Sequence, residues 1–212
     1  MSILDAALLD RASRLSSATM HEAAGKIGAL PAGIKPLAPH FRVCGRVFPV
    51  KSPPGDNLWL HRGIAEARAA DVLVVDTGSG FEYGYWGEVM TLAAQVRGIA
   101  GLVLTGGVRD SLRIIEMGFP VFSSTISIQG TAKDPNGNGS LGDPLRIGGA
   151  TVAKGDLILG DADGVLVVPQ SQAHQVIADS ERRDRDEVRI FESLRAGKTT
   201  LEIYGLPGGL TT

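Results

Sequence analysis

The apolar positions between residues 72 and 96 change from the spacing of a strand to that of a helix. Residues 72–76 form a short apolar run that ends in an acid, and a loop with four glycines follows. After Gly87 the apolar positions fall three or four residues apart, at Val89, Leu92, Ala93 and Val96. Short continuous apolar runs are typical of buried strands, whereas the wider spacing is typical of one face of a helix. The pattern predicts a strand followed by a helix.

A second unit of the same kind follows directly. Gly98 ends the first helix, residues 101–105 predict a strand, Gly106-Gly107 a loop, and residues 111–117 a shorter helix. Because strand–helix–strand crossovers are right-handed in nearly every case, the two strands are predicted to be parallel. Both loops then open at the carboxyl edge of the sheet, where ligands bind in open α/β proteins. Polar residues of the two loops should therefore share one cleft.

The flanking segments predict many short elements joined by tight turns. Ser17 or Thr19 is a suitable N-cap for a helix that ends at Gly25. The segments expected are helical residues 3–27, a loop at 31–39, a strand at 41–50, a turn at 53–56, a helix at 57–69, a loop at 133–140, a β meander at 144–168, a long charged helix at 170–196 with Val176, Ile177, Val188, Phe191 and Leu194 on its apolar side, and a tail at 201–206.

Composition and charge narrow the class of ligand. The 212 residues are 43% hydrophobic and 21% charged with a net charge of −2, and a linker-like segment is absent from the sequence, so one domain over 1–212 is expected. Interspersed charges of both signs give no footprint for nucleic acid or for a membrane. The single Cys44 and the lack of a signal-like or spanning apolar run predict a cytoplasmic protein. A small-molecule ligand is therefore expected.

Several other motifs have competing interpretations. Residues 76–80 combine a strand-end acid with Gly-x-Gly, which loosely resembles the cofactor loop of S-adenosylmethionine-dependent methyltransferases, but the later acid that holds a ribose is absent. Residues 161–164 match the start of a calcium loop without its later ligands, so a tight turn explains them better. The lysines lie in turns or polar stretches that do not suit a Schiff base, and the four histidines lack metal-ligand spacing.

Glu88, followed after twenty residues by Arg109 and Asp110, is the constellation with the clearest chemical potential. A purely structural interpretation has Asp110 capping the helix at 111, Glu88 in a favourable first turn, and Arg109 paired with one of them. A functional interpretation has Asp110 holding a divalent cation with few protein ligands, as Mg²⁺ prefers. The amides of Val89 and Met90 would then form an anion site at the start of a helix. Both interpretations remain open on the residues alone.

The sequence from Gly87 to Asp110 resembles the RraA-like family. The enzymatic members of this family are class II pyruvate aldolases that act on 4-hydroxy-4-methyl-2-oxoglutarate and 4-carboxy-4-hydroxy-2-oxoadipate. An acid, twenty residues, then Arg-Asp is the hallmark of these enzymes. The similarity extends over most of the chain, including residues 35–37, Gly45, 54–57, 155–156 and 161–165. The acid is usually Asp in this family, whereas here it is Glu88.

The resemblance implies an α/β fold, a layered β/β/α sandwich like the phosphohistidine swivelling domain. It implies Mg²⁺ or Mn²⁺ bound directly by Asp110, Arg109 on a substrate oxygen, and Gly87 to Met90 on the pyruvate moiety. It further implies trimers or dimers of trimers, with residues 170–212 packing on a neighbouring subunit. An outer-shell Glu would come from that neighbour, with Glu187 the best match and Glu181 or Glu192 as alternatives.

The implied reaction is retro-aldol cleavage of a 4-hydroxy-2-oxo acid to pyruvate and a second oxo acid. A cation would polarise the 2-keto oxygen, Arg109 would share the developing charge, and Glu88 would hold the water that takes the hydroxyl proton. Oxaloacetate decarboxylation would be a side activity, and the reaction would be part of the degradation of aromatic compounds. The competing hypothesis is a non-enzymatic regulator that binds a ribonuclease, as the family's namesake does. Such a regulator would not need Glu88, Arg109 and Asp110 together.

Overall fold

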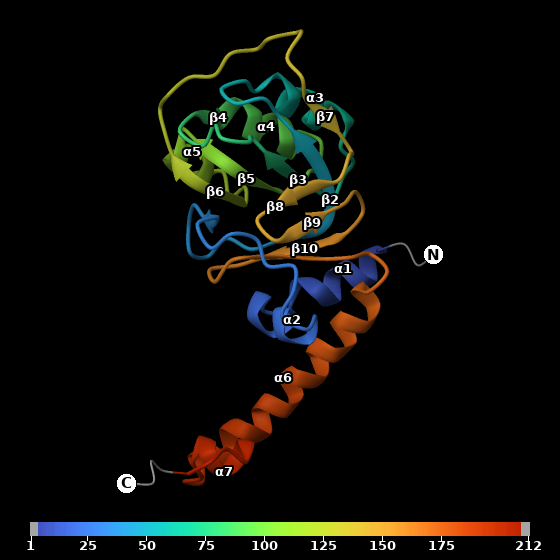
Figure 1. Ribbon diagram of the computed structural model, residues 1–212, viewed down its shortest axis with the longest axis vertical. Helices are drawn as coiled ribbons and strands as arrows, with labels where there is room; N and C mark the ends of the chain where they lie inside the picture. The colour runs from blue at the N-terminus through green and yellow to red at the C-terminus, as the bar shows by residue number, and fades with distance from the viewer. Residues whose placement is uncertain (1–3, 209–212) are drawn as a thin grey trace.

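The computed structural model describes residues 4–208, and a mixed β-sheet organises them (Figure 1). Within this range the main sheet has nine strands, in the order β1-β6-β5-β3-β2-β10-β11, with β4 paired to β5 and β7 to β2. Its strands are β1 (Lys35–Pro36), β2 (Val43–Lys51), β3 (Asp71–Asp76), β4 (Gly84–Trp86), β5 (Gly101–Val108), β6 (Val121–Ile126), β7 (Ser140–Leu141), β10 (Leu157–Gly160) and β11 (Val165–Val168). A separate hairpin is formed by β8 (Leu145–Ile147) and β9 (Ala150–Val152).

Helices cover the sheet in two groups. One group packs around a core that includes Leu60, Ala94 and Ile114, and the other packs on β10 and β11 through residues such as Leu8, Met20 and Ile177. The first group is α3 (Leu58–Glu66), α4 (Glu88–Val96) and α5 (Ser111–Glu116); the second is α1 (Ala6–Ser13), α2 (Ser17–Ala23) and α6 (Ala173–Arg195), and α7 (Thr200–Tyr204) follows α6. The distal part of α6 projects away from the body (Figure 1).

The predicted parallel units are confirmed. Strands β2, β3, β5 and β6 are parallel neighbours, with Val72 opposite Gly101 and Leu102 opposite Val121. Strands β10 and β11 extend the sheet in the antiparallel sense. The predicted α/β fold class is therefore confirmed as a mixed sheet with a parallel centre, and its carboxyl edge carries the loops that the sequence singled out.

The glycine-rich loops differ from the prediction. Gly106 and Gly107 are not in a loop but continue β5, and the expected loop after β3 contains the short strand β4. Tyr85 and Trp86 on β4 are fully buried, and a Cβ at Gly106 would lie 2.7 Å from a ring carbon of Tyr85. Gly106 is therefore needed for close packing, because a side chain there would displace an aromatic ring. At Gly107 a Cβ would instead lie 2.7 Å from the carbonyl oxygen of Tyr83.

The predicted helix between Gly87 and Gly98 is confirmed as α4, but most of the apolar positions that defined it are exposed. Val89, Leu92 and Val96 are 80%, 56% and 79% exposed. The face on the sheet instead carries Met90, Thr91 and Ala94. Thr91 can be buried because its hydroxyl accepts from Trp86 Nε1 at 2.8 Å and donates to the carbonyl of Gly87 at 3.0 Å. A stripe of apolar side chains thus faces outward in the single chain.

Other boundaries also needed correction. The N-cap of α2 is Ser16, not Ser17 or Thr19, because its side chain accepts from the amide of Thr19. Helix α3 ends at Glu66 instead of residue 69. The expected meander is split between two sheets, since β8 and β9 pair only with each other and β10 pairs with β2. In α6 the proximal Val176 and Ile177 are buried as expected, whereas Val188 and Phe191 are half exposed.

Among the described residues, no helix combines the length and the apolar character needed to span a bilayer.

Candidate active site

The structure brings together the start of α4 and the end of β5. The backbone amide of Glu88 donates to Asp110 Oδ2 at 3.0 Å, and Arg109 Nε lies 4.0 Å from the same oxygen. Pairing of Trp86 with Val108, and a hydrogen bond from the amide of Arg109 to the carbonyl of Trp86 at 2.8 Å, fix this junction. Residues separated by twenty positions in the sequence therefore share one site.

Asp110 does not cap its own helix. It occupies the N-cap position of α5 in a left-handed conformation with φ 56°, but its side chain makes no capping hydrogen bond there. Its carboxylate turns instead to the first amide of α4. The structural interpretation of Asp110 as the cap of the helix at 111 is therefore wrong. A left-handed non-glycine residue costs free energy and is common at functional sites.

Gly87 allows this approach. Its φ of −152° is extended and places no demand on glycine. A Cβ at this position, however, would lie 2.4 Å from Asp110 Oδ2 and 3.2 Å from Arg109 Cγ. The absence of a side chain at Gly87 is thus a steric requirement of the Asp110 carboxylate.

A cleft of about 250 Å³ opens at this junction. The side chains of Arg109 and Asp110 are 50% and 43% exposed, so both are accessible to a ligand. The residues that line the cleft are Asn57, His61, Tyr85, Gly87, Val89, Met90, Arg109, Asp110 and Lys133. Five of these nine were singled out in the sequence: Gly87, Val89, Met90, Arg109 and Asp110.

Glu88 lies beside the cleft and is not among its lining residues. Its Oε1 is 3.3 Å from both Nε and Nη2 of Arg113, and Arg113 also contacts Glu116. The structural interpretation had Arg109 paired with Asp110 or Glu88, and of these two it lies near Asp110, while Arg113 pairs with Glu88. Arg109 therefore keeps its guanidinium at the cleft.

Four lining residues were not predicted as site residues: Asn57, His61, Tyr85 and Lys133. Asn57 lies in residues 54–57, which are part of the family resemblance. That resemblance was the one signal in the sequence that could have identified Asn57 as a site residue. Burial lowers the pKa of His61, the nearby charge of Lys133 lowers it further, and Asp56 opposes the shift. The imidazole of His61 is therefore uncharged at neutral pH.

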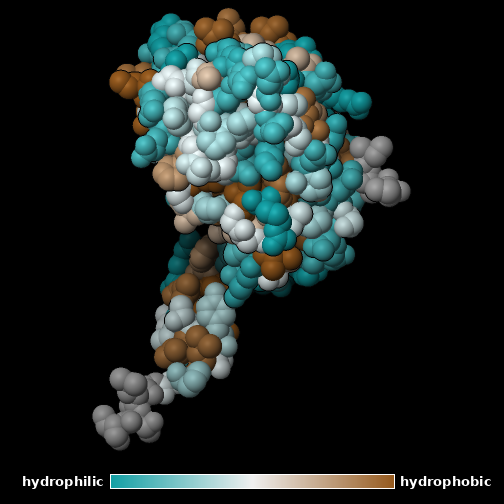
Figure 2. Space-filling model, turned by 45° about the horizontal axis from the view of Figure 1, so that its top comes forward, coloured by the Kyte–Doolittle hydropathy of each residue, from teal (hydrophilic) through white to brown (hydrophobic). Residues whose placement is uncertain are grey.

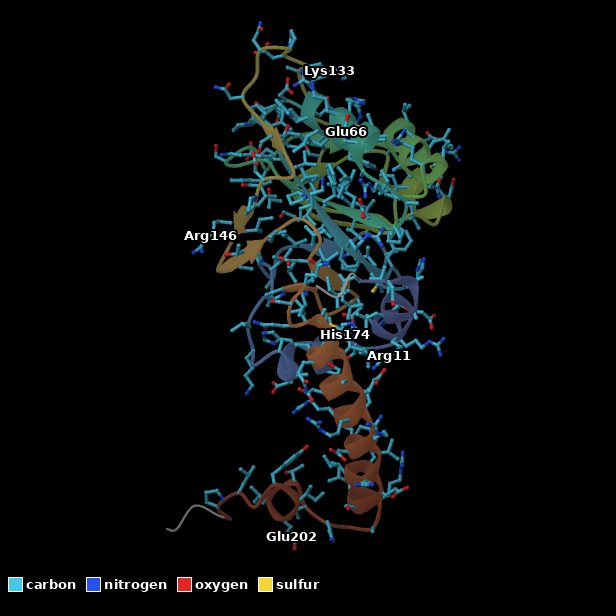
Figure 3. The ribbon with its side chains drawn as sticks, turned by 90° about the vertical axis from the view of Figure 1, so that its right-hand side faces the viewer. Arg11, Glu66, Lys133, Arg146, His174 and Glu202 are labelled. Carbon is cyan, nitrogen blue, oxygen red and sulfur yellow. The ribbon has the colours of Figure 1, made fainter. Side chains whose placement is uncertain are left out.

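The C-terminal glutamates are not near this cleft in the single chain. Glu187 lies on α6, which leaves the body at the end opposite α4 and β4 (Figure 1). Glu181 forms a two-bonded ion pair with Arg11, with both contacts at 2.8 Å. In the side-chain view, Arg11 lies beside α6 and Lys133 lies at the far end of the molecule (Figure 3).

Within residues 4–208, no three His, Cys, Asp or Glu side chains gather into a metal-binding group. A cation at this cleft would therefore have Asp110 as its protein carboxylate and would need oxygens from substrate and water. Mg²⁺ binds in this way, through one or two carboxylates plus substrate oxygens and several waters. The residues present fit such an ion.

The two competing motifs have structural roles. At residues 76–80, Asp76 Oδ1 accepts from the amide of Gly78, and a Cβ at Gly80 would lie 2.3 Å from the hydroxyl oxygen of Tyr85. Residues 161–164 form the predicted tight turn between β10 and β11, where Asp161 accepts from both the amide and the hydroxyl of Ser17. Neither loop lines the cleft.

A larger cleft of about 440 Å³ is lined by other residues, among them Phe48, Arg62, Glu66 and Lys154. It adjoins a smaller one that reaches Asp71, the first residue of β3. It thus lies toward the amino end of β3, away from the carboxyl edge where ligands of such sheets bind.

The protein is of the α/β class, with a mixed sheet and a cleft at the carboxyl edge of that sheet. A helix N-terminus, an arginine and an aspartate form the cleft. Residues 2–167 match the family model described as RraA-like, Aldolase/RraA, and the chain belongs to that family.

Proteins similar to this chain include one named as an aldolase and one titled as an inhibitor of RNA processing. A relative from Halalkalibacterium halodurans is 34% identical over 158 residues, which are 74% of each chain. A Thermus thermophilus protein named 4-hydroxy-4-methyl-2-oxoglutarate aldolase is 30% identical over 142 residues, 67% of this chain and 85% of its own. The solved structure titled as the RNA-processing inhibitor RraA from Thermus thermophilis has a TM-score of 0.66 and 28% identity, and the match covers 73% of this chain and 93% of that one.

Proposed function

We propose that this protein is a divalent-metal-dependent class II pyruvate aldolase. Its substrate would be a 4-hydroxy-2-oxo dicarboxylic or tricarboxylic acid such as 4-hydroxy-4-methyl-2-oxoglutarate, cleaved to pyruvate and a second oxo acid. The observation that carries the proposal is the meeting of Arg109, Asp110 and the N-terminus of α4 at one accessible cleft. The aldolase name of a relative at 30% identity supports it.

The start of α4 provides a site for the substrate carboxylate. The first amides of a helix have no acceptor within the helix. The amide of Glu88 is used by Asp110 and that of Thr91 by the carbonyl of Gly87, while the described residues supply no acceptor to Val89 and Met90. These two amides and the positive end of the helix dipole favour an anion. The 1-carboxylate of a 2-oxo acid has the required charge and size.

Asp110 and Arg109 would hold the reacting oxygen. Asp110 is the residue that would bind Mg²⁺ or Mn²⁺, which when bound supplies a Lewis acid for the 2-keto oxygen. Arg109 would donate to the same oxygen as negative charge develops on it. Donors placed in advance at such a position are worth about 3–4 kcal/mol each. In the cleavage step the C3–C4 bond breaks, its electron pair forms the enolate, and the 4-hydroxyl loses its proton.

Glu88 would take that proton through a water. Its side chain lies beside the cleft and is held by Arg113 at 3.3 Å, which fixes its position without occupying the cleft. The enolate would then be protonated at C3 to give pyruvate. Oxaloacetate decarboxylation reaches the same enolate by loss of CO₂ and is expected as a side activity.

The proposal includes a homo-oligomer, a trimer or a dimer of trimers. The stripe of Val89, Leu92 and Val96 on α4 is exposed, and Leu112 on the neighbouring helix α5 is 74% exposed. Figure 2 shows hydrophobic surface both at the top of the body and on the projecting arm formed by α6 and α7. Packing of this arm on a neighbour would bury such surface and could bring Glu187 to the neighbour's site.

A direct assay tests the function. We expect pyruvate release from 4-hydroxy-4-methyl-2-oxoglutarate in the presence of Mg²⁺, and its loss with excess chelator. Asp110→Ala should abolish turnover while the circular dichroism spectrum is kept, because the residue lies in an accessible loop. Undiminished turnover in that variant would contradict the proposal. Absence of turnover in the native protein, together with capture of a ribonuclease, would favour the regulatory function of the family's namesake.

A further inference from the structure

Trp86 connects the two segments of the chain that meet at the cleft. Its carbonyl accepts from the amide of Arg109 at 2.8 Å, and it pairs with Val108 at the end of β5. Its indole Nε1 donates to the hydroxyl of Thr91 on α4 at 2.8 Å. Trp86 and Thr91 are fully buried, and the ring of Trp86 is stacked on that of Phe119 with 7° between the planes. Trp86 thus binds both the end of β5 and the start of α4.

The start of α4 needs such support because its N-cap residue has no side chain. Gly87 occupies the N-cap position and makes no side-chain capping hydrogen bond. The first amide of the helix, that of Glu88, donates instead to Asp110 Oδ2 at 3.0 Å. A cation on this carboxylate would weaken that hydrogen bond, because it withdraws electron density from the oxygen. The start of the helix therefore depends on a second anchor that the cation does not touch.

Thr91 provides the second anchor. Its hydroxyl and its amide both donate to the carbonyl of Gly87, each at 3.0 Å. The hydroxyl also accepts from Trp86, so its one donor and one of its acceptor positions are used inside the protein. On the sheet-facing side of a helix an apolar residue of equal size would avoid the cost of desolvating a hydroxyl. The presence of the hydroxyl indicates that it is needed to hold Gly87.

We propose that Trp86 and Thr91 position the start of α4 for substrate binding. Through the carbonyl of Gly87 they fix the direction of the amides of residues 89 and 90, where the 1-carboxylate of the substrate binds in the proposed function. Both side chains are buried beneath the helix, so they act through the backbone and not by contact with the substrate. The inference rests on the proposed aldolase function and assigns two positioning residues to its binding step.

Such a role predicts a division between KM and kcat. The 1-carboxylate takes no part in bond breaking, so its contacts are equal in the ground state and in the transition state. Loss of these contacts raises KM and leaves kcat unchanged. A purely structural role would instead lower the fraction of folded protein, which lowers kcat and leaves KM unchanged. Steady-state kinetics therefore tell the two roles apart.

Thr91→Val removes the hydroxyl and keeps the shape of the side chain. We expect KM for 4-hydroxy-4-methyl-2-oxoglutarate to rise about 10-fold, since a hydrogen bond to a charged group contributes a factor of this order to binding, while kcat is nearly unchanged. Thr91→Ser keeps the hydroxyl and should restore the native KM. An unchanged KM in Thr91→Val, or a rise that persists in Thr91→Ser, would overturn the proposal. Trp86→Phe, which removes the indole N–H and keeps an aromatic ring, gives the same test if Thr91→Val does not fold.

Ser180→Ala is the matched control. Ser180 is also fully buried in a helix, and its hydroxyl donates to the carbonyl four residues earlier, that of Val176, at 2.7 Å. Its helix α6 leaves the body at the end opposite α4 (Figure 1). The free energy of unfolding should fall in both variants, whereas KM should rise only in Thr91→Val. An equal rise in Ser180→Ala would assign the effect to general destabilisation and overturn the proposal.

Amide hydrogen exchange separates failure of this inference from failure of the proposed function, because it needs no turnover. The amide of residue 91 donates to the carbonyl of Gly87, and that of Arg109 donates to the carbonyl of Trp86. In Thr91→Val we expect the protection factor at residue 91 to fall about 10-fold, while that of Arg109 is retained. A fall at residue 91 would support the positioning role even if the native protein cleaves no substrate. Unchanged protection there would overturn it even in an active aldolase.

Discussion

The carboxylate of Asp110 accepts a hydrogen bond from the backbone amide of Glu88 at 3.0 Å and so joins the end of β5 to the first residue of α4. The same Oδ2 lies 4.0 Å from Arg109 Nε. The oxygen that organises the start of the helix is thus also part of the proposed cation site. Changes that move this carboxylate should affect activity before they affect the fold.

Gly87→Ala is the most direct way to move it. The added Cβ would lie 2.4 Å from Asp110 Oδ2, so the carboxylate must shift. We expect kcat for pyruvate release to fall about 100-fold or more, because misplacement by about 1 Å can have that effect. Gly149→Ala is the control, since a Cβ there meets no atom within 4 Å. Native activity in Gly87→Ala would contradict this geometry.

Glu88→Gln should separate the two reactions. Aldol cleavage needs a group that takes the 4-hydroxyl proton, and loss of such a group costs about 10²- to 10⁴-fold. Oxaloacetate decarboxylation has no hydroxyl proton to remove and should be largely retained. Arg113→Gln controls for loss of the ion pair, because it leaves the carboxylate of Glu88 in place. A parallel fall in both reactions would argue against the role of a base.

Arg109→Lys should instead lower kcat for both reactions, because both pass through the same enolate. A guanidinium offers a planar fork that can span two oxygens, whereas lysine offers one mobile charge. We expect a decrease of about 10²- to 10³-fold, the cost of removing one donor from an oxyanion site. Steady-state kinetics on the two substrates decide the matter. A rise in KM with unchanged kcat would limit Arg109 to substrate anchoring.

Leu92→Asp should weaken self-association. Leu92 is exposed in the middle of the apolar stripe of α4, so a charge there would cost little in the single chain but would have to be buried in an interface. Light scattering should show a smaller particle than for the native protein. Ile27→Asp, at an exposed apolar residue outside the stripe, is the control. A native protein that is monomeric and fully active would contradict the proposed assembly.

Asp161→Asn should destabilise the protein in a pH-dependent manner. Burial alone would raise the pKa of Asp161, but hydrogen bonds from Ser17 and Asp163 and the charge of Arg42 outweigh it and lower the pKa. The ionised form therefore stabilises the fold above the unfolded pKa of about 3.9, and this contribution is lost as pH falls through the folded pKa.

Urea unfolding at pH 7 should accordingly show that the free energy of unfolding of Asp161→Asn is about 1–3 kcal/mol lower than that of the native protein. The difference from the native protein should shrink as the pH is taken below about 4. Asp163→Asn is the matched control, because it changes the neighbouring exposed carboxylate of the same turn. A deficit that does not vary with pH would show that the charge of Asp161 is not its source.

The parallel centre of the fold was predictable because its signals are local. Apolar runs and glycine stops at residues 72–76 and 98–105 define strand–helix units without knowledge of distant contacts. The apolar spacing of α4 was misleading for the opposite reason. Spacing reveals that Val89, Leu92 and Val96 share a face, but it cannot tell whether that face packs on the sheet or on another chain.

The contribution of Lys133 to the cleft was not predictable from the sequence, because it depends on a long-range β-bridge. Lys133 reaches the cleft only because residues 132–134 hydrogen-bond to residues 55–57. Nothing local marks a lysine in a polar loop as different from the other lysines in turns. The left-handed turn at Asp110, and its capping of α4, likewise depend on the register of β4 on β5.

The projecting part of α6 has a consequence for hydrogen exchange. Val176, Ile177 and Ser180 are buried against the body, whereas no residue of α6 beyond Ser180 is buried, and the distal part of the helix projects away from the body (Figure 1). Helical segments shorter than about 12–15 residues are marginal in water when they lack packing. In dilute protein the amides of 184–195 should therefore exchange fast while those of 176–183 are protected. Slow exchange along the whole arm at high protein concentration would show that another chain covers it.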